Sequence, residues 1–95
     1  MSAYIIFIRD RIRDEAEMGQ YGALARPAMA GHPLKPLVAY GKCETLEGAP
    51  VDGAVVLEFP DMDAAKAWYN SPAYTEARKH RHLGADYRAF ITQGV

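Results

Sequence analysis

Two segments of this chain are apolar at nearly every position, and they constrain the fold more than any other feature. Tyr4–Ile8 is apolar throughout, and Val55–Phe59 is interrupted only by Glu58. Both segments are rich in β-branched and aromatic residues, which favour strands. A strand with one solvated face alternates apolar and polar residues, and neither segment does so. The pattern therefore predicts two strands that are covered on both faces.

A helix is predicted after the first strand. Asp14 is an N-cap residue with Glu17 three positions later, which is the pattern of a capping box. Pro27 should bend or stop this helix, and Gly31 suits its C-cap. The residues predicted on its apolar face recur at three- and four-residue spacing, and they are Met18, Tyr21, Leu24, Ala25, Ala28 and Met29.

A second helical region is predicted after the strand at Val55–Phe59. Asp61 can cap its start. Ser71 followed by Pro72 marks an interruption and a restart, because serine caps helices well and proline suits the first helical position. Gly84 is expected to stop the helix.

The order of the elements predicts the fold class. The predicted strands are residues 3–9, 36–42, 54–59 and 87–92, with the polar residues 44–53 as the hairpin between the middle two. The resulting order, βαββαβ, is that of the ferredoxin-like α+β fold with a four-stranded antiparallel sheet. Right-handed crossovers place both helices on one face of the sheet and leave the other face open.

A homodimer is the simplest way to cover that open face. Leaving several large apolar side chains in water would cost roughly 1.5–3 kcal/mol each. A two-fold dimer is the commonest assembly of soluble proteins. The alternative is that a loop of the same chain covers the central strands.

Composition narrows the classes of partner. The length of 95 residues suits one domain, residues 1–95. The 11 basic and 12 acidic side chains nearly balance, so the composition gives no excess of positive charge for binding nucleic acid. No apolar run is long enough to span a membrane, and no signal-peptide pattern opens the chain. The single Cys43 cannot form an internal disulfide, which suits a reducing cytoplasm.

A set of motifs runs along almost the whole chain. It consists of Asp14 with Tyr21 and Pro27, His32, Glu44–Gly48, Val56–Pro60, Ala64-Ala65, Ala67–Tyr74 and Arg81. These motifs resemble those of the domain-of-unknown-function family 1330, in the dimeric α/β-barrel superfamily. The resemblance implies two four-stranded sheets that meet in a dimer with the helices outside, and it implies no particular activity.

One segment departs from the usual pattern of that family. Residues 33–36 read Pro-Leu-Lys-Pro where relatives carry Gly-Gly-Arg-Phe, and Ala39 and Tyr40 replace an arginine and a glycine. A ligand group that relatives hold with this segment would therefore lose its contacts here.

His32 and Arg81 are the polar residues most suited to chemistry. His32 follows a helix end, and a histidine there can act as a general acid or base, or simply bond to a loop carbonyl. Arg81 shares a helix face with Tyr74 and Ala77, so it needs a partner for its charge. That partner would be a ligand carboxylate, or Glu58 or Asp86, unless the side chain extends to solvent.

Aromatic residues complete the predicted ligand site. Tyr21, Trp68, Tyr69 and Tyr74 are expected between the helices and the sheet, as a pocket lining or simply as core. Arg88 shares a strand face with Phe90, where it would bind a ligand, reach across the dimer or form a salt bridge.

Other features give no support for cofactors. The basic cluster at residues 78–82 is spread around a helix and indicates a solvated face, and its histidines are poorly spaced for a metal. No phosphate loop, dinucleotide fingerprint or Cys-x-x-Cys pair is present, so no cofactor and no metal is expected.

Three functions remain open at this point. The first is a small-molecule-binding homodimer with a pocket between the helices and the sheet. The second is a cofactor-independent enzyme, a monooxygenase, isomerase or lyase, acting on a small organic acid or aromatic substrate; this rests on fold analogy. The third is a structural partner subunit with no pocket.

Overall fold

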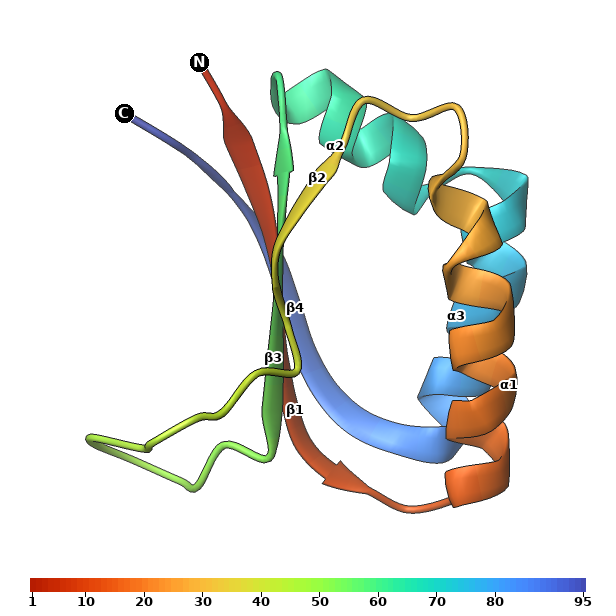
Figure 1. The fold of residues 1–95 in the computed structure, drawn as a ribbon, viewed down its shortest axis with the longest axis vertical. Coiled ribbons are helices and arrows are strands. Elements are labelled where there is room, and N and C mark those ends of the chain that lie inside the picture. The colour runs from red at the N-terminus through yellow and green to blue at the C-terminus, as the bar shows by residue number, and fades with distance from the viewer.

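The computed structural model of the protein describes residues 1–95 and consists of one antiparallel sheet with helices on one face (Figure 1). The elements are β1 (Ala3–Ile12), α1 (Glu15–Ala25), the 3-10 turn η1 (Pro27–Met29), β2 (Lys35–Ala39), β3 (Gly53–Phe59), α2 (Met62–Tyr69), α3 (Pro72–Gly84) and β4 (Ala85–Gln93). The strand order β2-β3-β1-β4 places the two apolar strands, β1 and β3, at the centre. The predicted ferredoxin-like α+β fold is confirmed.

The helices start where the sequence predicts. The Asp14 carboxylate accepts from the backbone N–H groups of Ala16 and Glu17 at 3.0 and 3.2 Å, and Asp61 caps α2 in the same way. The predicted capping box is not closed by Glu17, because its carboxylate instead lies 2.6 Å from Nδ1 of His80. This contact joins α1 to α3.

Two predictions about helix residues differ from the structure. Leu24 is 39% exposed, because it lies about 100° around α1 from the buried Ala25. Gly84 does not follow α3 but forms its last residue. Its carbonyl accepts from the N–H groups of Arg13 and Asp14 at 2.7 and 3.0 Å, which ties the end of α3 to the start of α1.

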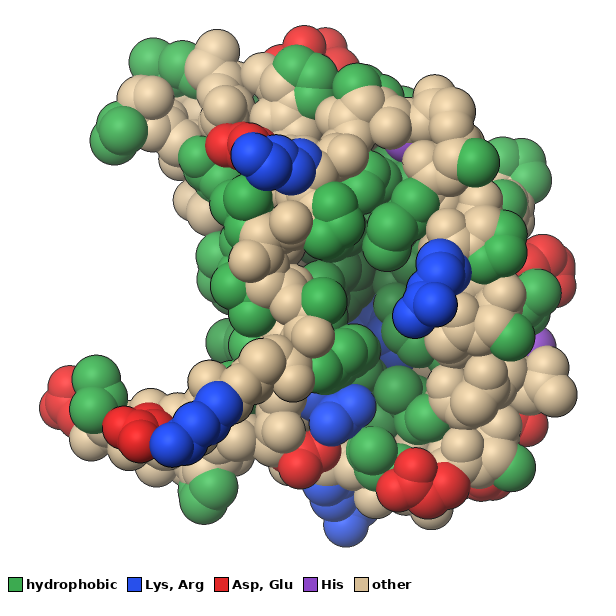
Figure 2. All heavy atoms as spheres, in the orientation of Figure 1, with side chains coloured by type: hydrophobic (Ala, Val, Ile, Leu, Met, Phe, Trp, Pro, Cys, Tyr) green, Lys and Arg blue, Asp and Glu red, His purple; other side chains and the backbone are tan.

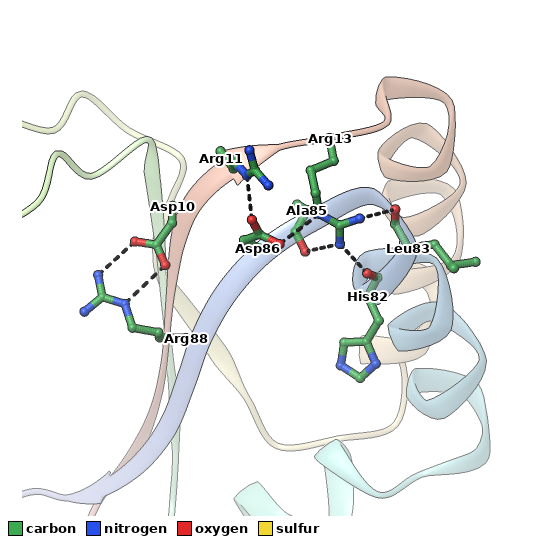
Figure 3. Close-up of polar contacts among 8 residues, drawn as sticks. All are labelled: Asp10, Arg11, Arg13, His82, Leu83, Ala85, Asp86 and Arg88. Carbon is green, nitrogen blue, oxygen red and sulfur yellow. Dashed lines mark hydrogen bonds and ion pairs between the residues drawn. The ribbon is translucent and has the colours of Figure 1, made fainter.

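The edge strands also differ from their predicted bounds. β2 begins and ends earlier than expected, and all five of its residues are exposed. β1 continues to Ile12 across a register shift between Arg9 and Arg11. Its extension pairs with the start of β4 and brings Arg11 and Arg13 to Asp86 (Figure 3).

The core lies between the helices and the sheet. Its largest buried side chains are Ile5, Leu57, Phe59, Trp68 and Tyr74. The opposite face of the sheet carries Ile6, Ile8, Val56 and Phe90, and Phe90 is 48% exposed. No element of the chain covers that face (Figure 1).

None of the helices has the length and apolar character that crossing a bilayer requires.

Candidate functional site

A cavity of about 700 Å³ lies between α1 and the sheet, and we call it the main cavity. It opens between β2 and α1, where Figure 2 shows a hollow lined mostly by hydrophobic side chains. The sheet contributes Phe7, Val55 and Leu57 to its lining, and α2 and α3 contribute Trp68 and Tyr74.

The main cavity exists because α1 packs against α3 rather than against the sheet. The side of α1 that faces the cavity carries the small residues Gly19, Gly22 and Ala25. A Cβ atom added at either glycine would meet no atom within 4 Å. The space beneath α1 is therefore open, and these glycines are not required by close packing.

Two tyrosines form a hydroxyl pair on the helical side of the main cavity. The Oη atoms of Tyr21 and Tyr74 lie 2.8 Å apart, and either can be the donor. Burial raises the pKa of both phenols. The Arg81 guanidinium acts against burial and lowers the pKa of Tyr74, which places its charge close to this pair.

A second hydroxyl pair joins Tyr40, which lines the main cavity, to Tyr87 on β4, which does not line it. The Oη atoms of Tyr40 and Tyr87 lie 2.6 Å apart, and the Arg9 guanidinium lies 4.7 Å from the centre of the Tyr40 ring. Gly53 makes room for this arrangement, because a Cβ atom there would lie 3.0 Å from Tyr40 Cδ1. Arg9 itself donates to Asp52 at 2.7 Å.

Tyr40 adopts a backbone conformation that few large residues tolerate. Its φ angle is +59°, in the left-handed region. The family resemblance has a glycine at this position. The sequence marked Tyr40 only as a departure from the family pattern and did not mark Tyr87 or Arg9, because the three meet only when segments far apart in the chain come together.

The hydroxyl pairs define what the main cavity can do chemically. A phenol has one hydrogen to donate, so in each pair one hydroxyl donates to the other and the second keeps its hydrogen. Burial also raises the pKa of Tyr40. Tyr21, Tyr40 and Tyr74 therefore keep their hydrogens at neutral pH, and the pairs can offer hydrogen-bond donors and acceptors to a ligand.

Trp68 is also part of the main cavity. Its ring lies 4.1 Å, centre to centre, from that of Tyr74. Its indole Nε1 is buried without a hydrogen-bond partner in the protein. A buried donor of this kind is free to meet an acceptor on a ligand.

Arg81 and Tyr69 line a second, separate opening of about 470 Å³, which we call the side hollow. It lies between the end of α3 and β4, and Arg13, His82, Tyr87 and Ala89 also line it. Arg81 is 3% exposed, and it pairs with neither Glu58 nor Asp86, the two carboxylates that the sequence offered.

Two predicted site residues lie elsewhere. His32 borders a shallow surface hollow with Pro33, Lys35 and Glu58, and it does not line the main cavity. Arg88 lies on the face of the sheet opposite to the helices, where it donates to Asp10 at 3.0 Å (Figure 3). Tyr21, Trp68 and Tyr74 therefore line the main cavity, and Tyr69 and Arg81 line the side hollow, although the Tyr69 ring lies only 5.6 Å from that of Tyr74.

No group of three or more His, Cys, Asp or Glu side chains lies close enough together to hold a metal ion.

Comparison with known proteins places the chain in a family. The sequence profile of the domain of unknown function DUF1330 matches residues 2–95. The chain belongs to the DUF1330 family. A comparison with curated proteins finds no match.

Solved structures resemble this DUF1330 chain in fold. The RPA0582 protein of unknown function from Rhodopseudomonas palustris is 21% identical with a TM-score of 0.76, over 99% of this chain and 82% of that one. A dimeric protein of unknown function and ferredoxin-like fold from Bacteroides fragilis is 14% identical with a TM-score of 0.62, over 98% and 96%. SnoaB, a cofactor-independent oxygenase from Streptomyces nogalater, is 11% identical with a TM-score of 0.63, over 99% and 92%. At these identities the likeness shows the fold alone.

Proposed function

We propose that this DUF1330 chain is a homodimer that binds a small, largely apolar organic molecule in the main cavity. The observation that carries the proposal is a cavity of about 700 Å³ whose apolar walls hold the Tyr21–Tyr74 hydroxyl pair and the Tyr40 hydroxyl. Ligand sites in proteins have this size and this mixture of apolar walls with a few fixed polar groups. Tyr21, Trp68 and Tyr74 are the proposed ligand contacts among the residues that the sequence singled out.

The uncovered face of the sheet supports the homodimer. Ile6, Val56 and Phe90 lie side by side on the central strands and β4 with no layer over them. The similar protein from Bacteroides fragilis is dimeric. A second copy would bury these side chains, and full burial of each one would stabilise the dimer by roughly 1.5–3 kcal/mol.

A cofactor-independent enzyme is the second candidate, and its support is the likeness in fold to SnoaB. The buried phenols favour binding over catalysis. Burial raises the pKa of Tyr21 and of Tyr40, so each hydroxyl is a hydrogen-bond donor rather than a base at neutral pH. The open main cavity also counts against a purely structural subunit.

A cytoplasmic location remains a prediction. Cys43 is exposed and free, which a reducing compartment tolerates.

Thermal unfolding with neutral aromatic probes tests the binding function. Phenol, 4-ethylphenol and 1-naphthol should raise the melting temperature, because a ligand at about 100 times its Kd adds about 2.7 kcal/mol of stability. Gly22→Leu places a side chain in the main cavity and should abolish the rise, whereas Gly22→Ala should keep it. The proposed function is wrong if no probe stabilises the protein, or if the Gly22→Leu variant is stabilised equally.

A further inference from the structure

We propose that the side hollow is a second binding site, which takes the carboxylate of a small organic acid and holds it on Arg81. The side hollow shares no lining residue with the main cavity. The walls of the two openings are joined by the Tyr40–Tyr87 hydroxyl pair and by the Tyr69 and Tyr74 rings, which lie 5.6 Å apart, so each site is tested with its own probe and its own variant.

Arg81 has no counter-ion within the chain. It is the only charged side chain of the buried set. Glu58 accepts from the Tyr4 hydroxyl, and Asp86 is held by Arg11 and Arg13. Burying a charge without an opposite charge raises the free energy of the folded protein. Because the chain supplies no carboxylate here, only an anion bound from solution can neutralise Arg81.

The guanidinium of Arg81 packs against aromatic rings and lies close to the Tyr74 hydroxyl, and none of these groups carries a negative charge. Its Cζ lies 5.3 Å from the Phe7 ring centre and 4.9 Å from the Tyr87 ring centre. Ring faces stabilise a cation but offer no acceptor in the plane of the guanidinium. Nε has no hydrogen-bond partner, and one Nη meets Nε2 of His82 only at 3.5 Å. A carboxylate binds to the edge of a guanidinium through two parallel hydrogen bonds.

The charges around the side hollow favour an anion. Arg13 and Arg81 both line it, and the carboxylate of Asp86 is already shared between Arg11 and Arg13. The His82 side chain is exposed and held only by its long contact to Arg81. It can therefore turn aside and admit a ligand.

The geometry points to a monocarboxylate rather than to a phosphate. The side hollow lies at the C-terminal end of α3, where the helix dipole opposes negative charge and opposes a dianion more than a monoanion. The single positive charge of the Arg81 guanidinium is balanced by the single negative charge of one carboxylate. The rings of Tyr69 and Tyr87 and the methyl group of Ala89 provide apolar surface for the body of the acid. A small aromatic acid such as benzoate fits both requirements.

A titration of isotope-labelled protein with benzoate tests this site. Benzoate should shift the backbone amide signals of Tyr87 and Ala89, which line the side hollow, and leave that of Gly19, which lines the main cavity, unmoved. Benzyl alcohol, which has the same ring without the charge, should give no saturable shift at Tyr87. Shifts confined to Gly19, equal shifts with benzyl alcohol or inorganic phosphate, or no saturable shift with benzoate would each overturn the assignment.

Variants of Arg81 test whether its charge holds the ligand. Arg81→Met should weaken benzoate binding roughly 10- to 100-fold, since a charge-assisted pair is lost. Lys79→Met removes an exposed positive charge from the same helix and should leave the affinity unchanged. Arg81→Lys keeps the charge without the planar fork, and a smaller loss is expected, so it replaces Arg81→Met if that variant does not fold. Unchanged affinity in Arg81→Met and Arg81→Lys would refute the role of Arg81. The Gly22→Leu variant should still bind benzoate, which separates this site from the main cavity.

Discussion

The guanidinium of Arg13 donates to the carbonyl of His82 at 2.6 Å and so closes the C-terminal end of α3 (Figure 3). The same guanidinium reaches the carbonyls of Leu83 and Ala85 at 3.3 and 3.2 Å. Its Nε donates to Asp86 at 2.8 Å. One side chain from the loop before α1 therefore satisfies carbonyl groups that the end of α3 leaves without partners.

Arg13→Ala should destabilise the fold because it removes these contacts together. We expect a loss of about 1–2 kcal/mol in urea unfolding, since each hydrogen bond contributes modestly and the side chain is partly exposed. Arg11→Ala is the matched control. Arg11 contacts only the carboxylate of Asp86 and is 68% exposed, so its loss should cost under about 0.5 kcal/mol. Equal losses in the two variants would contradict the capping role.

Stability should fall in acid partly through Asp86. Hydrogen bonds from Arg11 and Arg13 lower the pKa of its carboxyl. A carboxyl whose pKa is lower in the folded state stabilises the protein above its unfolded pKa, and this contribution is lost as the pH falls through the folded pKa. The free energies of unfolding of the wild type and of Asp86→Asn should therefore differ at pH 7 and converge as the pH falls below the folded-state pKa of Asp86. A difference that persists in acid would show that the side chain acts without its charge.

Short stretches of the sequence were sufficient to predict where the helices begin. Asp14, Asp61 and Ser71 cap helices through atoms two or three residues away, so the sequence around each contains the whole interaction. The continuous apolar runs predicted two strands, and the structure places β1 and β3 at the centre of the sheet. Cover on the second face of these strands stays a prediction, since no element of the chain lies over it.

The sites depend on contacts between distant segments, which one segment cannot predict. Arg81 lacks a counter-ion because Arg11 and Arg13 already bind the carboxylate of Asp86. These two arginines reach Asp86 only because β1 continues past its register shift. The pair of Tyr40 with Tyr87 requires the missing side chain at Gly53. The sequence predicted that Arg81 needs a partner, but not that the chain supplies none.

Gly84→Ala should destabilise the protein because α3 ends against the start of α1. A Cβ atom at this position would lie 3.1 Å from the backbone nitrogen of Met18 and 3.1 Å from Cβ of Glu17. Backbone cannot move aside as a flexible side chain can, so we expect a loss of roughly 1–3 kcal/mol in chemical denaturation. Gly19→Ala is the control: its added Cβ meets no atom within 4 Å, and the helix should gain stability. A neutral Gly84→Ala would mean that α1 shifts freely.

A charge on the uncovered face of the sheet should dissociate the proposed homodimer. Ile6 lies between Val56 and Phe90 on that face, and Ile6→Lys would place an ammonium group in the interface. Sedimentation should change from a species of twice 10.5 kDa to one of 10.5 kDa. Lys66→Glu, an exposed change on α2, should leave the mass unaltered. A wild type that sediments as a monomer at micromolar concentration would rule out the dimer.

Filling the main cavity should make the protein more stable while it removes ligand binding. Gly22 lies on α1 and lines the cavity, and a Cβ atom added there would meet no atom within 4 Å. Gly22→Leu should therefore gain roughly 0.5–1 kcal/mol from helix propensity alone, and more if the leucine packs against Phe7 or Leu57. Gly22→Ala should also gain helix propensity, but its methyl group is too small to fill the main cavity. Comparing the two variants therefore separates the effect of helix propensity on stability from the effect of filling the cavity. A Gly22→Leu variant that loses stability would show instead that the space under α1 is not open in solution.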